Sequence, residues 1–184
     1  MTAAPDFATL ERRLREHLDQ EHRFEHSLRV AACAQELARR HGVDPQKARL
    51  AGLLHDLARL YSPQQLILEA EARAMPITPF EREKPALLHA ALGAALARER
   101  FGVDDPDVLS AIAKHTRGAP EMSPLDCVVY LADSLEPART FAERAELWEY
   151  ALRDLAGATR ETMRRSEEHY ARKRAAAEAP ASAS

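Results

Sequence analysis

The stretch Leu53-Leu54-His55-Asp56-Leu57-Ala58 decides how we interpret this sequence. It places an imidazole beside a carboxylate inside an otherwise apolar run of helical character. Because a buried carboxylate loses its hydration, Asp56 should have a strong partner in the core. A metal ion accepts histidine and aspartate together. The simpler interpretation is a helix whose one polar edge touches solvent, and a two-residue motif does not exclude it.

Residues typical of helix starts and helix ends flank this stretch on both sides. A capping residue followed by proline predicts helix starts at Asp44-Pro45, Ser62-Pro63, Asp105-Pro106 and Ser123-Pro124. The first of these helices should carry His55 and Asp56. We expect further helices over residues 7–17, 21–40, 85–101 and 142–174, and a loop with a short helical turn over 75–84. No strand-like alternation is present, so the sequence predicts an all-α single domain over residues 1–174. The Ala-, Ser- and Pro-rich tail 175–184 is expected to be disordered.

Composition narrows the class of protein. The chain has 184 residues, of which 46% are hydrophobic, so it can bury one sizeable core. A net charge of −3 predicts neither a general nucleic-acid partner nor a membrane surface. No apolar run approaches the ~20 residues that a membrane span needs. The start has no signal-peptide pattern, which predicts a cytoplasmic protein. Cys33 and Cys127 lie in apolar helical patterns and should be reduced core residues.

Four further polar residues also fall on apolar faces of predicted helices: His26, His89, His115 and Asp133. A lone histidine in such a place is usually a core residue bonded to a backbone carbonyl. Six such groups on five helices, however, would be costly to bury without a shared purpose. A metal centre would satisfy all of them, since imidazole and carboxylate suit iron, manganese, nickel, cobalt or zinc. Structural zinc sites rely on cysteine, which this set lacks. The set therefore indicates a catalytic centre with open coordination positions.

The order His26 … His55-Asp56 … His89 … His115 … Asp133 resembles the HD-domain metal-dependent phosphohydrolase superfamily, in the variant whose two extra histidines support a dinuclear site. The flanking blocks resemble the bacterial YqeK family of symmetrical dinucleoside tetraphosphatases. These blocks are His22-Arg23-Phe24-Glu25-His26-Ser27, Ala51-Gly52-Leu53-Leu54-His55-Asp56, Lys84-Pro85-Ala86-Leu87-Leu88-His89, His115-Thr116-Arg117-Gly118 and Tyr130-Leu131-Ala132-Asp133-Ser134-Leu135-Glu136-Pro137. The resemblance covers residues 18–155 and implies an HD-domain helical bundle with a dinuclear metal site in its core.

The resemblance implies a role for each of the six residues. One metal would be held by His26, His55, Asp56 and Asp133, and the second by His89 and His115 with Asp56 as the bridge. The family favours iron, with manganese or another divalent ion as alternatives. Two cations about 3.5–4 Å apart can deprotonate a shared water near neutral pH, and the hydroxide would attack phosphorus. Asp56 and Asp133 would thus be catalytic, with Asp133 also orienting the nucleophile.

A nucleotide polyphosphate substrate carries several negative charges and calls for cationic contacts. The blocks supply six candidates for these contacts: Arg23, Arg59, Lys84, Thr116, Arg117 and Arg139. Three positions depart from the family pattern. Arg59 stands for lysine, Ala90-Ala91 for Gly-Pro, and Arg117 for a second threonine. These departures affect substrate positioning and remove no metal ligand.

Several alternatives stay open at this point. The implied activity is hydrolysis of diadenosine tetraphosphate to two ADP, but another nucleotide, such as a deoxynucleotide or an alarmone, would use the same metal ligands. A non-catalytic nucleotide sensor and a metal-stapled structural bundle belong to other classes of protein. A homodimer is compatible with the sequence. We interpret Arg164 and His169 of the last predicted helix as parts of a charged solvent face, and Tyr150 as a packing residue.

Overall fold

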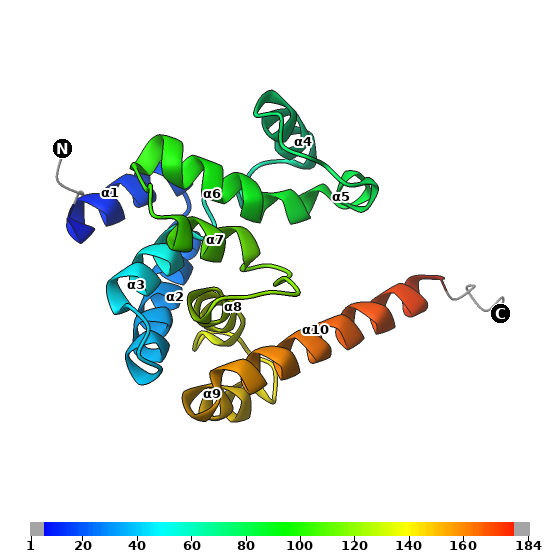
Figure 1. Ribbon diagram of the computed structural model, residues 1–184. Helices are drawn as coiled ribbons and strands as arrows, with labels where there is room; N and C mark the ends of the chain where they lie inside the picture. Colours follow the sequence, from blue (N-terminus) through cyan, green and yellow to red (C-terminus); the bar gives the residue numbers. More distant parts are fainter. Residues whose placement is uncertain (1–5, 179–184) are drawn as a thin grey trace.

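The computed structural model describes residues 6–178, which contain ten α-helices and one short 3-10 helix and no strand (Figure 1). The all-α fold class is therefore confirmed. None of the described helices combines the length and the apolar character needed to cross a membrane. The elements are α1 (Phe7–Leu18), α2 (Glu21–Arg40), α3 (Pro45–Leu54), α4 (Pro63–Ala72), α5 (Pro79–Glu83), η1 (Pro85–Leu87), α6 (Leu88–Phe101), α7 (Pro106–Lys114), α8 (Pro124–Leu135), α9 (Arg144–Arg153) and α10 (Leu155–Glu178).

Helix starts follow the capping chemistry that the sequence predicts. Asp44 accepts hydrogen bonds from the backbone amides of the first turn of α3, and Asp105 does the same for α7. Ser62 and Ser123 form capping boxes at the starts of α4 and α8. Each cap satisfies backbone donors that have no partner inside the helix. One start differs from the prediction, because Pro85 opens the 3-10 turn η1 and α6 begins at Leu88.

The core lies where α2, α3, α7 and α8 pack on one another, with α6 against α7. Its side chains are mainly leucine and alanine, including the fully buried Leu37, Leu54 and Leu131. Burying each such leucine contributes about 1.5–3 kcal/mol relative to leaving it in water. Cys33 and Cys127 are both buried and free, as predicted. These helices form a rigid frame around the polar residues that the sequence places inside it.

The segment with the His-Asp pair is not helical throughout, which corrects the prediction. Helix α3 ends at Leu54, and His55 and Asp56 open a run of turns that extends to Leu60. The cause is local, since the His55 ring lies 2.7 Å from the carbonyl oxygen of Gly52 and takes that acceptor. The pair therefore sits at a helix end, where side chains can point along the helix axis into the core.

The last predicted helix is in fact two helices. Asp154 has an extended backbone that separates α9 from α10, and its carboxylate accepts a hydrogen bond from the Gly157 amide at 2.9 Å. The side chain thus acts as a cap that starts a new helix. Helix α10 packs on α8 and α9 and then projects from the bundle (Figure 1). It runs to Glu178, and residues 179–184, most of the tail that the sequence predicts to be disordered from residue 175, lie outside the described part.

Gly52 provides a test of the packing between α2 and α3. A Cβ atom at this position would lie 3.0 Å from the Ala31 Cα and 3.1 Å from the Val30 carbonyl oxygen, both backbone atoms of α2. Gly52→Ala must push the helices apart and should destabilise the protein by about 1–3 kcal/mol. For a chain of this size we expect the melting temperature to fall by roughly 5 °C, measured by calorimetry. An unchanged melting temperature would contradict this packing.

Candidate metal centre

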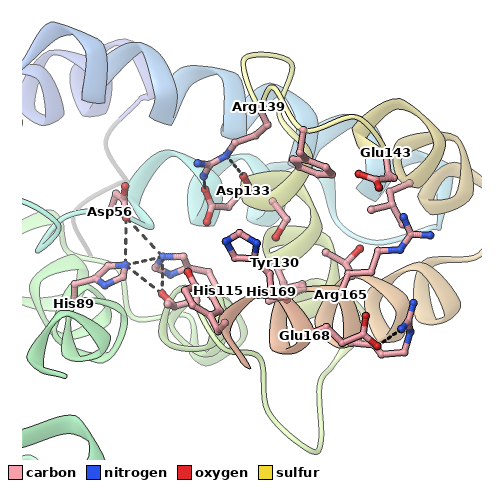
Figure 2. A pocket seen from close by; sticks show the side chains of 18 of the residues that line it. Asp56, His89, His115, Tyr130, Asp133, Arg139, Glu143, Arg165, Glu168 and His169 are labelled. Atoms are coloured by element: carbon pink, nitrogen blue, oxygen red, sulfur yellow. Dashed lines mark hydrogen bonds and ion pairs between the residues drawn. The ribbon is translucent and has the colours of Figure 1, made fainter. Parts of the chain in front are cut away.

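Six polar side chains from five parts of the chain converge in the core. His26 comes from α2, His55 and Asp56 from the end of α3, His89 from α6, His115 from the end of α7 and Asp133 from α8. The four histidines and Asp56 are buried, with at most 7% of any residue exposed. Figure 2 shows Asp56 pointing toward His89 and His115, with Asp133 on the neighbouring wall. The structure thus brings together all six residues that the sequence singles out as metal ligands.

The carboxylate of Asp56 divides this cluster into two halves. Its Oδ1 lies 3.4 Å from His89 Nε2 and 3.7 Å from His115 Nε2. Its Oδ2 lies 3.9 Å from His26 Nε2 and 3.6 Å from His55 Nε2. Ligand atoms bound about 2.1 Å from one ion lie roughly 3–3.5 Å apart, so these spacings suit coordination with little movement. One oxygen for each half is the arrangement that a bridging carboxylate requires.

Asp133 completes the half that contains His26 and His55. Its Oδ1 lies 3.1 Å from His26 Nε2 and 3.7 Å from His55 Nε2. The same oxygen lies 2.6 Å from an Arg139 nitrogen, which donates to it, and a second Arg139 nitrogen donates to the Asp133 backbone carbonyl. Asp133 is therefore held from both sides, by an imidazole from the core and by a guanidinium from the cavity side.

The orientation of the histidine rings is fixed by their outer nitrogens. In three of them Nδ1 contacts the backbone carbonyl three residues earlier: His55 at Gly52, His89 at Ala86 and His115 at Ile112, at 2.5–2.7 Å. A carbonyl only accepts, so Nδ1 carries the proton in each ring. Each Nε2 therefore presents a lone pair to the centre, which is the form that binds a metal.

Two observations show that these groups fit a cation. His55 Nε2 is buried and has no hydrogen-bond partner among the described residues. The Nε2 atoms of His89 and His115 lie 3.1 Å apart. With both protons on Nδ1, two lone pairs would face each other there, and a positive charge between them removes that repulsion. The donor set of imidazole and carboxylate therefore fits a transition-metal ion.

The protonation states of His55 and Asp56 also favour a cation. Burial lowers the pKa of His55 to about 4, so this imidazole is neutral at physiological pH. Burial raises the pKa of Asp56, but the neighbouring imidazoles of His55 and His115 lower it more, and it lies well below its usual value. Neutral imidazole and ionised carboxylate are the states in which these groups bind metals.

Glu136 is a functional candidate that the sequence-based set does not contain. It is 2% exposed, and its Oε1 accepts from His26 Nδ1 at 3.2 Å. Its Oε2 accepts from Arg29 Nε and from the Ala138 amide, both at 2.8 Å. His26 is thus the one histidine of the four whose outer nitrogen faces a carboxylate. One feature of the sequence could have indicated Glu136: it follows Asp133 by about one helical turn, in the block that ends at Pro137.

Glu136→Gln should weaken metal binding without removing a ligand. The substitution keeps the shape but removes the charge that orients His26 and raises its basicity, and outer partners of this kind contribute about 10–100-fold in affinity. Competition titration against a chelator measures the change. Glu99→Gln is a matched control, because Glu99 pairs with Arg73 on the surface. Equal affinity of the two variants would exclude this role.

A cavity of about 800 Å³ opens beside the cluster. Asp56, His89, His115 and Asp133 line one end of it. Four of the predicted substrate contacts also line it: Arg23, Arg59, Thr116 and Arg139. Thr116 Oγ1 lies 3.2 Å from His89 Nε2 and 3.1 Å from His115 Nε2. A guanidinium nitrogen of Arg23 lies 3.5 Å from Asp56 Oδ2.

The other two predicted contacts lie elsewhere. Lys84 and Arg117 are not among the residues that line this cavity. Both instead approach the ring of Phe80, with the Lys84 Nζ 5.1 Å and the Arg117 Cζ 5.2 Å from its centroid. Such distances are typical of cation–π contacts. A phosphate-binding role for these two residues stays a prediction.

The wall opposite the cluster is formed by α10, which the sequence does not indicate. Eight of its residues line the cavity: Thr162, Arg164, Arg165, Ser166, Glu168, His169, Tyr170 and Arg172. Arg164 and His169 are exposed, as the solvent-face interpretation predicts, and they also line the cavity. The sequence does not show this second property, because a polar cavity wall and a solvent face have the same residue composition along one helix.

Fold and site together define a helical protein with a histidine–aspartate metal centre beside a cationic cavity. The family model of the HD domain, a metal-dependent domain, matches residues 23–138, and the chain belongs to this family. A symmetrical bis(5'-nucleosyl)-tetraphosphatase of Halalkalibacterium halodurans is 39% identical over 140 residues, which cover 75% of this chain and 73% of that protein. Its namesake in Bacillus subtilis is 39% identical over 135 residues, covering 73% and 72%.

The fold has a similar counterpart among solved structures. The crystal structure of a predicted HD superfamily hydrolase involved in NAD metabolism, from Clostridium acetobutylicum, matches with a TM-score of 0.87 and 33% identity. The match covers 93% of this chain and 90% of that one. The similarity therefore extends beyond the residues that the family model matches.

Proposed function

We propose that this protein hydrolyses dinucleoside tetraphosphates symmetrically, converting diadenosine tetraphosphate and water into two ADP. The observation that carries the proposal is the similarity to proteins of this name at 39% identity over about three quarters of the chain. The converging histidines and aspartates beside a cationic cavity supply the chemistry that such an activity needs. The substrate is a nucleotide polyphosphate, which the arginines of the cavity suit by charge.

Two divalent metal ions would be held by the cluster. His26, His55, Asp56 and Asp133 would hold one, and His89, His115 and the other oxygen of Asp56 the second. We propose iron, with manganese or another transition metal as the alternative, since imidazole-rich sets bind these ions well. Bound metal ions would lower the pKa of water toward neutrality and withdraw charge from the phosphoryl oxygens.

The remaining steps belong to the side chains. Arg23, Arg59 and Arg139 would bind the phosphates, with Thr116 as a hydroxyl donor at the same end of the cavity. Asp133 would orient the attacking water, because Arg139 and His26 fix its carboxylate. Attack at an inner phosphorus forms one P–O bond and breaks the central P–O–P bridge. One nucleoside diphosphate keeps the oxygen of the attacking water, and the other departs with the bridge oxygen as a leaving group that does not need a strong general acid.

A substrate comparison tests this proposal against its alternatives. Diadenosine tetraphosphate, a deoxynucleoside triphosphate and a guanosine alarmone are offered separately to the metal-loaded protein, and kcat/KM is measured for each. We expect the tetraphosphate to have the highest value. A higher value for either other nucleotide would assign the site to another substrate, and metal-dependent binding without turnover of any would indicate a sensor.

The arginines can be ranked by the same assay. Arg59 lines the cavity and is not part of any ion pair among the side chains that the structure describes. Arg59→Ala should therefore raise the KM for the tetraphosphate about tenfold, the value of a charge-assisted hydrogen bond to phosphate. Lys84→Ala, outside the cavity, should change it less. The reverse order would place the polyphosphate on the Phe80 side of the cluster.

A further inference from the structure

The end of the cavity away from the metal cluster has no role in the chemistry described above. Figure 2 shows Arg165, Glu168 and Glu143 on the side of the cavity away from Asp56 and His89, with His169 between them and His115. The whole cavity has a volume of about 800 Å³, which is in the range of sites that enclose a whole small molecule and not a phosphate group alone. This distal end must therefore accommodate the part of the substrate that is not being cut.

Two of the three arginines of α10 that line the cavity, Arg164 and Arg165 but not Arg172, already have acidic partners. Arg164 is paired with Glu161 and Glu168, and Arg165 with Glu161. Glu143 and Glu168 both line the cavity, and the carboxylate of Glu143, which is in no ion pair among the described side chains, would repel phosphate oxygens. Carboxylates do accept hydrogen bonds from hydroxyl and amino groups. A neutral group that carries such donors, as ribose and adenine do, fits this end better than an anion.

The cavity also exposes aromatic surface. Aromatic residues are only 5% of the sequence, yet Tyr170 and Phe141 line the cavity while 60% and 43% exposed. Tyr170 also packs edge-to-face with His169, with ring centroids 5.6 Å apart. The His169 contact helps to hold an exposed ring that contributes nothing to the core. An exposed ring on a cavity wall is a surface on which a nucleobase can stack.

We infer that α10 forms a nucleoside site, in which one base of the substrate stacks on Tyr170 and its sugar faces Glu143 and Glu168. The inference rests on the proposed function, since it assigns the nucleotide's phosphates to the metal end. It identifies Tyr170 as a residue that determines substrate specificity. The site also supplies a reason for symmetrical cleavage, because a base held at a fixed distance from the metals selects which phosphorus they reach.

Binding of two products to the metal-loaded protein tests the inference. Calorimetric titration compares ADP, which has a base, with inorganic pyrophosphate, which has none. Tyr170→Ala should weaken ADP binding about tenfold, as expected for loss of one stacked base, and leave pyrophosphate binding unchanged. Tyr170→Phe keeps the ring and should bind ADP as the unchanged protein does. Leu68→Ala, an exposed apolar residue on α4 outside the cavity, is the control for a general surface effect.

The results that would overturn the nucleoside site differ from the result that would refute the proposed function. Equal weakening of ADP and pyrophosphate by Tyr170→Ala would show that the residue acts on phosphates or on folding, and no change in either would place the base elsewhere. Weaker ADP binding by Phe80→Ala alone would place it beside Lys84 and Arg117. Each of these results overturns the inference. Failure of the wild-type protein to produce ADP from the tetraphosphate would refute the proposed function instead, and the ADP–pyrophosphate comparison does not depend on it.

Discussion

Asp56→Ala should abolish turnover and release metal while the helices stay folded. Both oxygens of this carboxylate face histidine pairs, one pair in each half of the cluster, so the substitution removes a ligand from both halves at once. Without Asp56, the two metal ions that we propose would lose the one ligand that they share, and with it the means of activating water. We expect kcat/KM to fall by roughly 10³-fold or more, and elemental analysis to show the loss of metal.

Asp107→Ala is the matched control for this prediction. Asp107 pairs with Lys47 on the surface and lies on α7, the helix that ends at His115. This variant should retain both activity and metal. Circular dichroism should show the helical content of both variants to be close to that of the unchanged protein. An active Asp56→Ala variant that retains its full metal content would refute the site.

Stripping the protein of metal with a chelator should also eliminate activity and lower the melting temperature. An ion that binds the folded chain a thousandfold above its dissociation constant contributes about 4 kcal/mol, which corresponds to roughly 10 °C for a protein of this size. Four imidazoles surround the centre, so iron or manganese should restore both properties. Scanning calorimetry and a turnover assay on the same samples measure the two effects.

Magnesium is the control ion for that experiment. It prefers oxygen ligands and keeps several waters, whereas this cluster offers four imidazole nitrogens and two carboxylates. It should restore the melting temperature much less than the transition metals at the same concentration. Full recovery of stability and activity with magnesium would contradict the assignment of His89 and His115 as ligands.

The positions of the six core residues could be predicted because burial imposes a pattern on the sequence. Polar residues at helical spacing among leucines and alanines must point inward, and His26 and Asp133 illustrate this on α2 and α8. A buried histidine can be both a core residue bonded to a backbone carbonyl and a candidate metal ligand. His55 bonds a backbone carbonyl through Nδ1, as an ordinary core histidine does, and presents Nε2 to the centre.

Three features could not be predicted, each for a physical reason. The end of α3 at Leu54 depends on a side chain that takes the Gly52 carbonyl, a contact that helical periodicity does not register. The start of α10 depends on the conformation of Asp154, a residue that is also common inside helices. That α10 lines the cavity depends on how the helix is placed in the fold. Arg164 and Tyr170 belong to no apolar stripe, so the sequence pattern does not indicate which way they face.

The identity of the products formed from diadenosine tetraphosphate tests the central claim most directly. The metal-loaded protein is incubated with the substrate, and the nucleotides are separated by anion-exchange chromatography before the reaction is complete. Attack at an inner phosphorus with cleavage of the central P–O–P bridge predicts ADP as the sole product, two molecules for each tetraphosphate consumed. Formation of ATP and AMP in equal amounts, or no turnover by protein with its full metal content, would contradict it.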